Sequence, residues 1–295
     1  MIETFQDRHR CKVCGWEQPG QGWVPVSQPV PHTADHQGEL AAPVTVMLTP
    51  VLEPIGLNTI TQGNCLDLLP RVASGSVDMV LCDLPYGTTQ NAWDTVIPFD
   101  RLWEQYRRIL KPGGTVVLSA SQPFTTAVVA SNYPWFRYEW IWRKNNATGH
   151  LNAHRMPMKE HENILVFGQG TVPYNAQGLR LFMKKTRRGG NGGNFGKSGT
   201  ENFQQFTGYP RSVLEFETDS PKLHPTQKPV ALWEYLIRTY TNEGDTVLDN
   251  CCGSGTTGVA CQNTGRNFIQ FELSPEYCEI ARSRLKPLAE ERIAA

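Results

Sequence analysis

Short apolar runs alternate with helical segments along the chain from residue 57 onward. The runs have the length and apolar character of buried parallel strands. We expect these strands at 58–62, 77–82, 115–119, 138–142, 164–167, 246–249 and 268–273. Helices are expected between them at 99–110, 125–130, 230–240 and 255–264, and a last helix is expected after Ser274, which has the residue type and position of an N-cap. Strands that alternate with helices predict an α/β fold with a doubly wound, mostly parallel sheet.

Two stretches interrupt this pattern and divide the chain. Residues 1–56 are rich in Pro, Gln and Gly without sustained periodicity, which predicts a partly disordered N-terminal appendage. Residues 170–222 carry weak helix and strand signals around a glycine-rich stretch at 188–194, which is more typical of an insertion than of a core segment. The remaining ranges, 57–169 and 223–295, would then form the two halves of one α/β domain.

Composition and charge add two exclusions to this picture. The 28 Lys and Arg residues balance 28 Asp and Glu residues, so any basic surface for nucleic acid has to be local. No apolar run approaches the roughly 18 residues of a membrane span, and the polar residues 1–10 lack the apolar segment of a signal peptide. Most of the eight cysteines stand in strand-like or helix-like segments, which favours reduced thiols and a cytoplasmic location.

A glycine-rich loop follows the expected strand 246–249 and precedes a helix. Gly253, Gly255 and Gly258 have the Gly-x-Gly-x-x-Gly spacing, in which glycines let the backbone turn tightly and approach a bound ligand. Glu272 closes the next strand, 19 residues after Gly253, where a carboxylate can accept hydrogen bonds from ribose hydroxyls. Nicotinamide dinucleotides and S-adenosylmethionine both carry such a ribose, so this spacing alone leaves a dehydrogenase and a methyltransferase open.

The tetrapeptide Asp83-Leu84-Pro85-Tyr86 follows the apolar run 77–82, so we expect it at the carboxyl edge of the sheet, where α/β proteins bind ligands. An exocyclic amine of a base is a poor nucleophile because its lone pair is delocalised into the ring. The side chain of Asp83 and the carbonyl of Leu84 can accept from the amino hydrogens and stabilise the positive charge that develops on the nitrogen. Pro85 stiffens the turn, and Tyr86 offers a ring face to a flipped base. An ordinary strand-to-loop turn would also explain these four residues taken alone.

These motifs, in this order, resemble the beta class of amino methyltransferases that act on DNA. The shared segments span roughly residues 57–289; they are 63–67 (GNCLD), 76–78 (SVD), 83–87 (DLPYG), 110–114 (LKPGG), 161–165 (HENIL), 224–229 (HPTQKP), 249–258 and 268–272. The resemblance implies a Rossmann-like methyltransferase fold with a circularly permuted motif order, in which the catalytic tetrapeptide precedes the cofactor loop. It makes 57–169 the catalytic half, 170–222 a target-recognition insertion and 223–295 the cofactor-binding half. The stretch 83–94 (DLPYGTTQNAWD) further resembles phage and prophage members.

The resemblance implies S-adenosylmethionine as the methyl donor and assigns residues to it. They are Asn64, His224, Gln227, Lys228, Asp249, Gly253, Ser254, Gly255, Thr256 and Glu272, with a further contact from Asp83. Three positions depart from the family pattern. Asn250-Cys251 replaces Pro-Phe beside the methionine moiety, Asn64 stands where Asp is frequent, and Leu84 replaces a frequent Pro but keeps the carbonyl that the chemistry uses.

A local basic run lies inside the expected insertion. The chain has no acidic residue between Glu162 and Glu201. The cations of this run are Arg180, Lys184, Lys185, Arg187, Arg188 and Lys197. Lys and Arg dominate contacts with DNA phosphates, so we expect these side chains to bind double-stranded DNA; the alternative is a solvated surface.

Four residues near the N-terminus have the types of zinc ligands. Cys11 and Cys14 form a Cys-x2-Cys pair, and His32 and His36 follow after a 17-residue spacing. Tetrahedral zinc takes four such ligands, so a structural zinc site is one hypothesis for this segment. The long spacing and the neighbouring prolines favour the alternative, a metal-free tail.

The motifs together predict a site-specific DNA methyltransferase that flips a base and methylates its exocyclic amine. Asp83 favours N6 of adenine, because cytosine-N4 enzymes of the family more often carry Ser at that place. A NAD-dependent dehydrogenase would leave the tetrapeptide and the segment 224–229 unexplained, and an inactive DNA-binding relative would have a damaged tetrapeptide. Double-stranded DNA is the expected partner, and a homodimer and a restriction endonuclease partner are left open. Trp135 and Trp142 are expected in the core, and Glu162 is expected to serve structure at a strand start.

Overall fold

The computed structural model describes residues 9–10, 16–18, 24–25, 53–91, 94–187, 201–221 and 223–285. The chain divides into two units, residues 1–50 and 51–295. In the first unit β1 (His9–Arg10), β2 (Trp16–Gln18) and β3 (Val24–Pro25) pair as a small antiparallel sheet, which the sequence pattern did not predict. The residues of the zinc hypothesis lie outside the described residues: Cys11, Cys14, His32 and His36.

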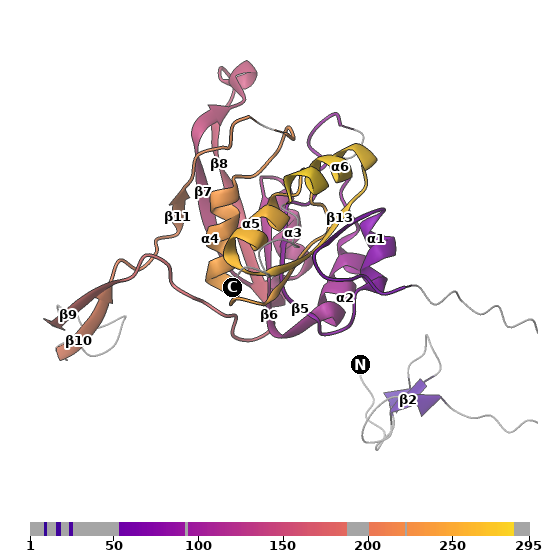
Figure 1. The fold of residues 1–295 in the computed structure, drawn as a ribbon. Helices are drawn as coiled ribbons and strands as arrows, with labels where there is room; N and C mark the ends of the chain where they lie inside the picture. The colour runs from indigo at the N-terminus through magenta and orange to yellow at the C-terminus, as the bar shows by residue number, and fades with distance from the viewer. Residues whose placement is uncertain are drawn as a thin grey trace, which may run out of the picture. The chain divides into compact units, whose positions relative to one another are not determined.

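The second unit is built on an eight-stranded sheet with the order β11-β7-β8-β6-β5-β12-β13-β4 (Figure 1). Its strands are β4 (Thr59–Gln62), β5 (Val77–Cys82), β6 (Leu110–Ala120), β7 (Phe136–Thr148), β8 (Lys159–Gly168), β11 (Val213–Glu215), β12 (Thr246–Asp249) and β13 (Asn267–Glu272). Neighbouring strands run parallel, except that β8 is antiparallel to both β6 and β7. The mostly parallel sheet confirms the α/β fold that the alternating pattern predicts.

Helices lie on both sides of this sheet. They are α1 (Cys65–Leu68), α2 (Phe99–Ile109), α3 (Phe124–Ser131), α4 (Val230–Tyr240), α5 (Thr256–Thr264) and α6 (Pro275–Arg284). The hydroxyl of Ser274 accepts a hydrogen bond from the amide of Tyr277, so Ser274 caps α6 as expected. None of the helices in the described ranges combines the length and the apolar character that crossing a membrane requires.

Strand β5 shows how one strand fills two cores. Val80 packs in the cluster that contains Tyr106 of α2, whereas its neighbour Met79 packs in the cluster that contains Leu236 of α4. Successive side chains of a strand point to opposite faces of the sheet. A strand that is buried on both faces therefore reads as an uninterrupted apolar run, which is why the pattern revealed β5 so clearly.

The stretch 170–222 contains strands where the sequence signals were weak. β9 (Arg180–Arg187) and β10 (Glu201–Thr207) pair antiparallel as a ribbon that is separate from the eight-stranded sheet (Figure 1). Met183 has a positive φ of 49°, and the register of the pair shifts between Gln204 and Phe206. Because these irregularities interrupt the alternation of side chains, a period of two residues did not reveal the ribbon.

Candidate active site

A cavity of about 400 Å³ lies where β5, β12 and β13 end. The carboxyl ends of parallel strands meet there, at the usual ligand position of open α/β sheets. Its wall combines the glycine loop and the tetrapeptide with residues from the segments 63–66 and 224–228. The fold thus gathers four motifs that are distant in sequence around one space, whose volume suits a nucleotide-sized ligand.

The glycine loop between β12 and α5 requires glycine at two positions. Gly253 and Gly255 have φ values of 52° and 79°, in the left-handed region that residues with a side chain rarely adopt. A β-carbon on Gly255 would also lie 2.7 Å from the β-carbon of Ala281, so the loop packs directly against α6. Gly253 lines the cavity, and Gly255 lies behind it.

Glu272 ends β13 at the cavity wall, and its carboxylate is held from two sides. Oε2 accepts a hydrogen bond of 2.8 Å from the amide of Gly253, and Oε1 accepts one of 2.8 Å from the amide of Ser274. Each carboxylate oxygen keeps further lone-pair capacity for a ligand. This geometry suits an acceptor for ribose hydroxyls, the role expected from the spacing.

Asp249, the last residue of β12, is buried under the same loop. Its carboxylate accepts hydrogen bonds from the hydroxyl of Thr257 and, at 3.1 Å, from the amide of Cys251. Burial raises the pKa of Asp249 to about 6, although both hydrogen bonds oppose this increase. Asp249 therefore fastens the glycine loop at its start and at the first turn of α5.

The segment 224–229 is joined to the glycine loop through Gln227. Oε1 of Gln227 accepts from the amide of Leu223 at 3.0 Å and from the hydroxyl of Ser254 at 3.3 Å. The ring of His224 packs edge-on against Tyr277, with the ring centroids 4.3 Å apart. Burial, with a smaller effect from Lys228, lowers the pKa of His224 against the opposing influence of Asp83.

Nine of the ten residues assigned to the cofactor by resemblance line the cavity, and Gly255 is the exception. Several of them also have structural partners. Nη1 of Arg284 donates to the hydroxyls of Ser254 at 3.1 Å and Thr256 at 3.3 Å. Oδ1 of Asn64 caps α1 by accepting from the amide of Leu66 at 2.9 Å. These partners hold the wall in place around the cavity.

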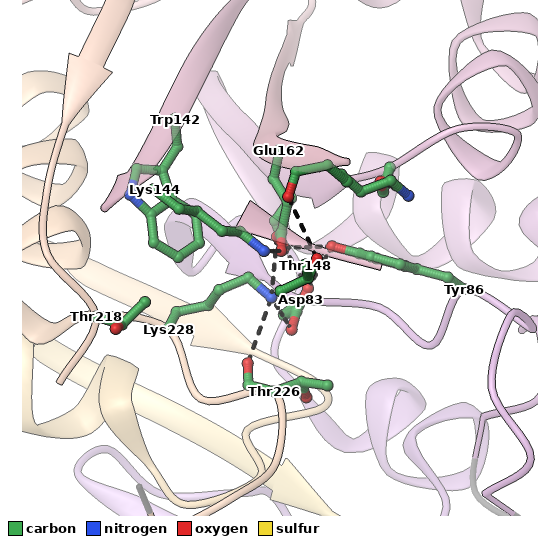
Figure 2. A network of polar contacts seen from close by, with 12 residues as sticks. Asp83, Tyr86, Trp142, Lys144, Thr148, Glu162, Thr218, Thr226 and Lys228 are labelled. Atoms are coloured by element: carbon green, nitrogen blue, oxygen red, sulfur yellow. Dashed lines mark hydrogen bonds and ion pairs between the residues drawn. The ribbon is translucent and has the colours of Figure 1, made fainter. Parts of the chain in front are cut away.

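Asp83 stands directly after β5 and accepts hydrogen bonds from three side chains. Its Oδ1 accepts from the hydroxyl of Tyr86 at 2.7 Å and from the hydroxyl of Ser119, and its Oδ2 accepts from the ammonium group of Lys228 (Figure 2). Leu84 is buried, and Pro85 lines the cavity. The tetrapeptide therefore presents one firmly oriented carboxylate at the cavity.

The ring of Tyr86 stacks on Phe124, with the ring centroids 4.9 Å apart. Burial, together with the negative charges of Asp83 and Glu162, raises the pKa of Tyr86 well above its ordinary value. The phenol is therefore neutral and donates its proton in the hydrogen bond to Asp83. An aromatic ring fixed in this way at a cavity wall can hold a second planar group.

Lys228 connects Asp83 to a second buried carboxylate. Its Nζ lies 3.3 Å from Oε2 of Glu162, and Nζ of Lys144 pairs with Oε1 of the same residue (Figure 2). Burial alone would lower the pKa of Lys228, but Asp83 and Glu162 raise it above the usual range. Burial would likewise raise the pKa of Glu162, and the two lysines hold it below the usual range. Lys228 and Glu162 are therefore both charged.

Three members of this network were not among the candidate site residues: Ser119, Lys144 and Glu162. Glu162 is expected to serve structure at a strand start; its carboxylate pairs with both lysines and also lines the cavity. A charge at the start of a strongly apolar strand is costly unless it is paired, and this was the available signal. Trp142 is buried and donates to the carbonyl of Phe216 at 2.9 Å, in the core as expected, and Trp135 packs edge-on against Trp103.

Asp94 orders the loop that follows the tetrapeptide. Its carboxylate accepts hydrogen bonds of 2.7–2.9 Å from the amides of Gly87, Thr88 and Thr89. Burial would raise the pKa of Asp94, but these hydrogen bonds outweigh it and lower the pKa. The loop therefore closes on Asp94 beside Tyr86.

Three of the cations expected to contact DNA lie on the ribbon and not at the cavity. Arg180, Lys184 and Lys185 are exposed on β9, and Nζ of Lys184 lies 5.2 Å from the ring centroid of Phe182. The structure does not describe the side chains of the other three cations, which are Arg187, Arg188 and Lys197. In the described ranges, no three His, Cys, Asp or Glu side chains are grouped to hold a metal ion.

The parallel sheet, the glycine loop with its closing glutamate and the acidic tetrapeptide on a neighbouring strand define a Rossmann-like methyltransferase. The chain belongs to the N6_N4_Mtase family of DNA methylases, whose model matches residues 77–283. The protein is thus an enzyme of DNA methylation, which confirms the methyltransferase prediction over the dehydrogenase.

Two relatives are Type II methyltransferases. M.HpaI of Haemophilus parainfluenzae is 28% identical over 237 residues, which cover 75% of this chain and 72% of the relative. M.HinfI of Haemophilus influenzae is 27% identical over 267 residues, which cover 79% of this chain and 69% of the relative. These names agree with the family and offer no support for zinc.

Solved structures are similar over most of the chain. The M1.HpyAVI–SAM complex is 25% identical with a TM-score of 0.54, over 77% of this chain and 99% of that chain. The PvuII DNA methyltransferase, described as cytosine-N4-specific, has a TM-score of 0.59 at 16% identity, over 80% of this chain and 89% of that chain. At this identity the PvuII enzyme supports the fold alone.

Proposed function

We propose that the protein transfers a methyl group from S-adenosylmethionine to N6 of a flipped adenine in double-stranded DNA. The observation that carries this proposal is the oriented carboxylate of Asp83 at the cavity that also contains Glu272. Asp83 would accept one hydrogen bond from the target amino group, and the carbonyl of Leu84 would accept another. Both acceptors are aimed where positive charge develops, so they stabilise the transition state more than the ground state.

The cavity fits S-adenosylmethionine in three respects. Glu272 has lone pairs left for the ribose hydroxyls, the backbone of Gly253 can approach the ligand, and the volume of about 400 Å³ suits its size. The solved relative M1.HpyAVI was crystallised with the same compound. When bound, S-adenosylmethionine supplies an electrophilic methyl group on a sulfonium. Asn64, His224 and Glu272 would hold it at the wall.

Tyr86 would hold the flipped base by stacking. Its ring rests on Phe124, and its neutral phenol donates to Asp83, so the aromatic face and the carboxylate keep a fixed relation. A base stacked on Tyr86 would therefore present its amino group near Asp83. Extruding a base requires an enzyme that can hold it outside the duplex, and this pair supplies the contacts.

The stretch 170–222 would recognise the DNA target. Its ribbon of β9 and β10 carries exposed Arg180, Lys184 and Lys185, which suit phosphate oxygens. With DNA as its substrate, the protein would act in the cytoplasm. Pairing with a second copy of the chain or with a restriction endonuclease stays a prediction.

N4 of cytosine is the second candidate. It is kept because the name of the N6_N4_Mtase family covers both N6 and N4 methylation. The test is transfer of labelled methyl groups to duplex DNA, followed by separation of the nucleosides. Label in N6-methyladenine supports the first candidate, and label in N4-methylcytosine supports the second. Absence of label from both nucleosides, with S-adenosylmethionine bound to the protein, would overturn the proposal.

A further inference from the structure

Lys228 is shared unequally between two carboxylates. Its Nζ donates to Oδ2 of Asp83 and lies 3.3 Å from Oε2 of Glu162. Within the described ranges, no group donates a well-directed hydrogen bond to that Oε2, although the atom is fully buried. A buried acceptor without a donor is unfavourable. Oε2 of Glu162 is therefore an acceptor position that the ammonium group can reach by a short movement.

The carboxylate of Asp83 already has three donors, so the acceptor position left for a target amine is on Oδ2, beside Lys228. Oδ1 accepts from Tyr86 and Ser119, and Oδ2 accepts from Lys228. An incoming amino group at Oδ2 lies against the ammonium group of Lys228 and competes with it for the negative charge of Asp83. Lys228 is the donor with a second carboxylate within reach, and its ammonium group lies 5.8 Å from the ring centroid of Tyr86, where an incoming base would meet it.

We propose that Glu162 is a positioning residue that receives the ammonium group of Lys228 when the target amine takes Oδ2 of Asp83. The inference rests on the proposed function, because it assumes an amine at Asp83. Lys144 pairs with Oε1 of Glu162 and so leaves Oε2 turned to Lys228. No proton is transferred in this exchange. One hydrogen bond of the ammonium group breaks, another forms, and the total charge of the site is unchanged.

The exchange also changes what Asp83 can do for the reaction. An ammonium group in contact with Asp83 neutralises much of its charge, so the carboxylate would stabilise a positively charged nitrogen less. With the ammonium group on Glu162, the negative charge of Asp83 is available to the target amine. Glu162 would thus act on turnover through Lys228, without touching the base.

A double-mutant cycle tests this dependence. Glu162→Gln keeps the shape of the side chain but removes the charge that attracts Lys228, so kcat for DNA methylation should fall roughly 10- to 100-fold, the usual coupling between contacting residues. In a Lys228→Met background the same change should have little effect, because the group through which Glu162 acts is gone. The exposed Glu160 stands on the same strand, and Glu160→Gln is the matched control that should keep kcat.

The pH profile separates positioning from a merely structural role. The charged and titratable groups that face Lys228 are Asp83, Glu162, Tyr86 and His224, with Lys144 beyond Glu162. Glu162→Gln removes one of the two carboxylates that raise the pKa of Lys228. Its ammonium group then loses its proton at lower pH and releases Asp83, so the variant should regain activity toward alkaline pH and the native protein should not.

Lysine-selective NMR on the protein alone keeps this test distinct from the proposed function. The signal of Lys228 is assigned by its absence in Lys228→Met and is then titrated in the native protein and in Glu162→Gln. We expect a lower Lys228 pKa in the variant. If the native protein methylates no base, the proposed function fails, and the titration still decides whether Glu162 controls Lys228. An unchanged Lys228 pKa, or an equal loss of kcat in both backgrounds, overturns the inference.

Discussion

The amide of Gly253 donates a hydrogen bond of 2.8 Å to Oε2 of Glu272, so the glycine loop and the end of β13 hold one another. The carboxylate that we propose to bind the ribose is therefore oriented before any ligand arrives. A preorganised acceptor has less conformational freedom to lose on binding. The same contact means that a change at Glu272 affects the loop as well as the ligand.

Glu272→Ala should weaken S-adenosylmethionine binding by about 1–3 kcal/mol, because the ribose loses its acceptor and the amide of Gly253 loses its partner. Isothermal titration calorimetry measures the dissociation constant directly. Glu276→Ala, an exposed change on α6, is the control and should keep the native affinity. Native binding of NAD in place of S-adenosylmethionine would contradict the assignment of the cavity.

The strands that position the site could be predicted because they are buried on both faces. The runs at β5, β12 and β13 have apolar, buried centres, and each leads to a carboxylate with its own chemistry: Asp83, Asp249 and Glu272. The carboxyl ends of parallel strands meet at one edge of the sheet. The positions of these three carboxylates at strand ends therefore predict that they lie close together.

The partners of Asp83 could not be predicted in the same way. Ser119 belongs to β6, Lys144 to β7 and Glu162 to β8. Strand β8 pairs antiparallel with both β6 and β7, and long-range contacts set this pairing. Nothing local in the sequence shows that Glu162 reaches the cavity or that Lys144 pairs with it. The expected strand 138–142 ends before Lys144, and the expected strand 164–167 begins after Glu162. Polar side chains mask the part of a strand that lines a polar site.

Replacing Arg180, Lys184 and Lys185 together by Ala should weaken DNA binding for all sequences and reduce its dependence on salt. Each lost phosphate contact lowers the slope of log affinity against log salt concentration by about 0.9. Fluorescence anisotropy with labelled duplex at several salt concentrations gives this slope. Arg101→Ala, an exposed change on α2, is the control. An unchanged slope in the triple variant would mean that the ribbon is only a solvated surface.

Asp83 and Tyr86 should have separable effects on methyl transfer. Asp83→Ala removes a preorganised acceptor, so turnover should fall by about 100-fold or more. Tyr86→Phe keeps the ring on Phe124 but loses the hydrogen bond to Asp83. The activation free energy of methyl transfer should therefore rise by about 0.5–1.5 kcal/mol. Tyr86→Ala also removes the stacking face, which should weaken binding of the flipped base by about 1–3 kcal/mol.

Single-turnover transfer of labelled methyl groups and DNA affinity, measured on the same proteins, distinguish these effects. Melting temperatures show whether each variant is folded, since Tyr86 also packs in the core. Full activity of a folded Asp83→Ala would mean that the tetrapeptide is not the catalytic site. Equal losses for Tyr86→Phe and Tyr86→Ala would mean that the ring does not hold the base.

Asp249 should make the protein less stable as pH rises through the range of its titration. Burial raises its pKa from 3.8 to about 6 in the folded protein, so between these values the folded state binds more protons than the unfolded chain. The stabilising effect of the protonated carboxyl is complete below about pH 4 and is lost as pH rises through 6. The two pKa values correspond to a loss of about 3 kcal/mol.

Asp249→Asn removes this titration and nearly keeps the shape of the side chain, which can still accept from the amide of Cys251. The free energy of unfolding is measured by urea denaturation for both proteins from pH 4 to pH 8. Subtracting the two curves cancels the other titrating groups. The native protein should lose stability relative to Asp249→Asn between pH 4 and pH 7, and the difference should then stay level. A difference that is constant across this range would contradict a buried, raised carboxyl at Asp249, and one that changes in the opposite direction would mean that its hydrogen bonds with Thr257 and Cys251 outweigh burial.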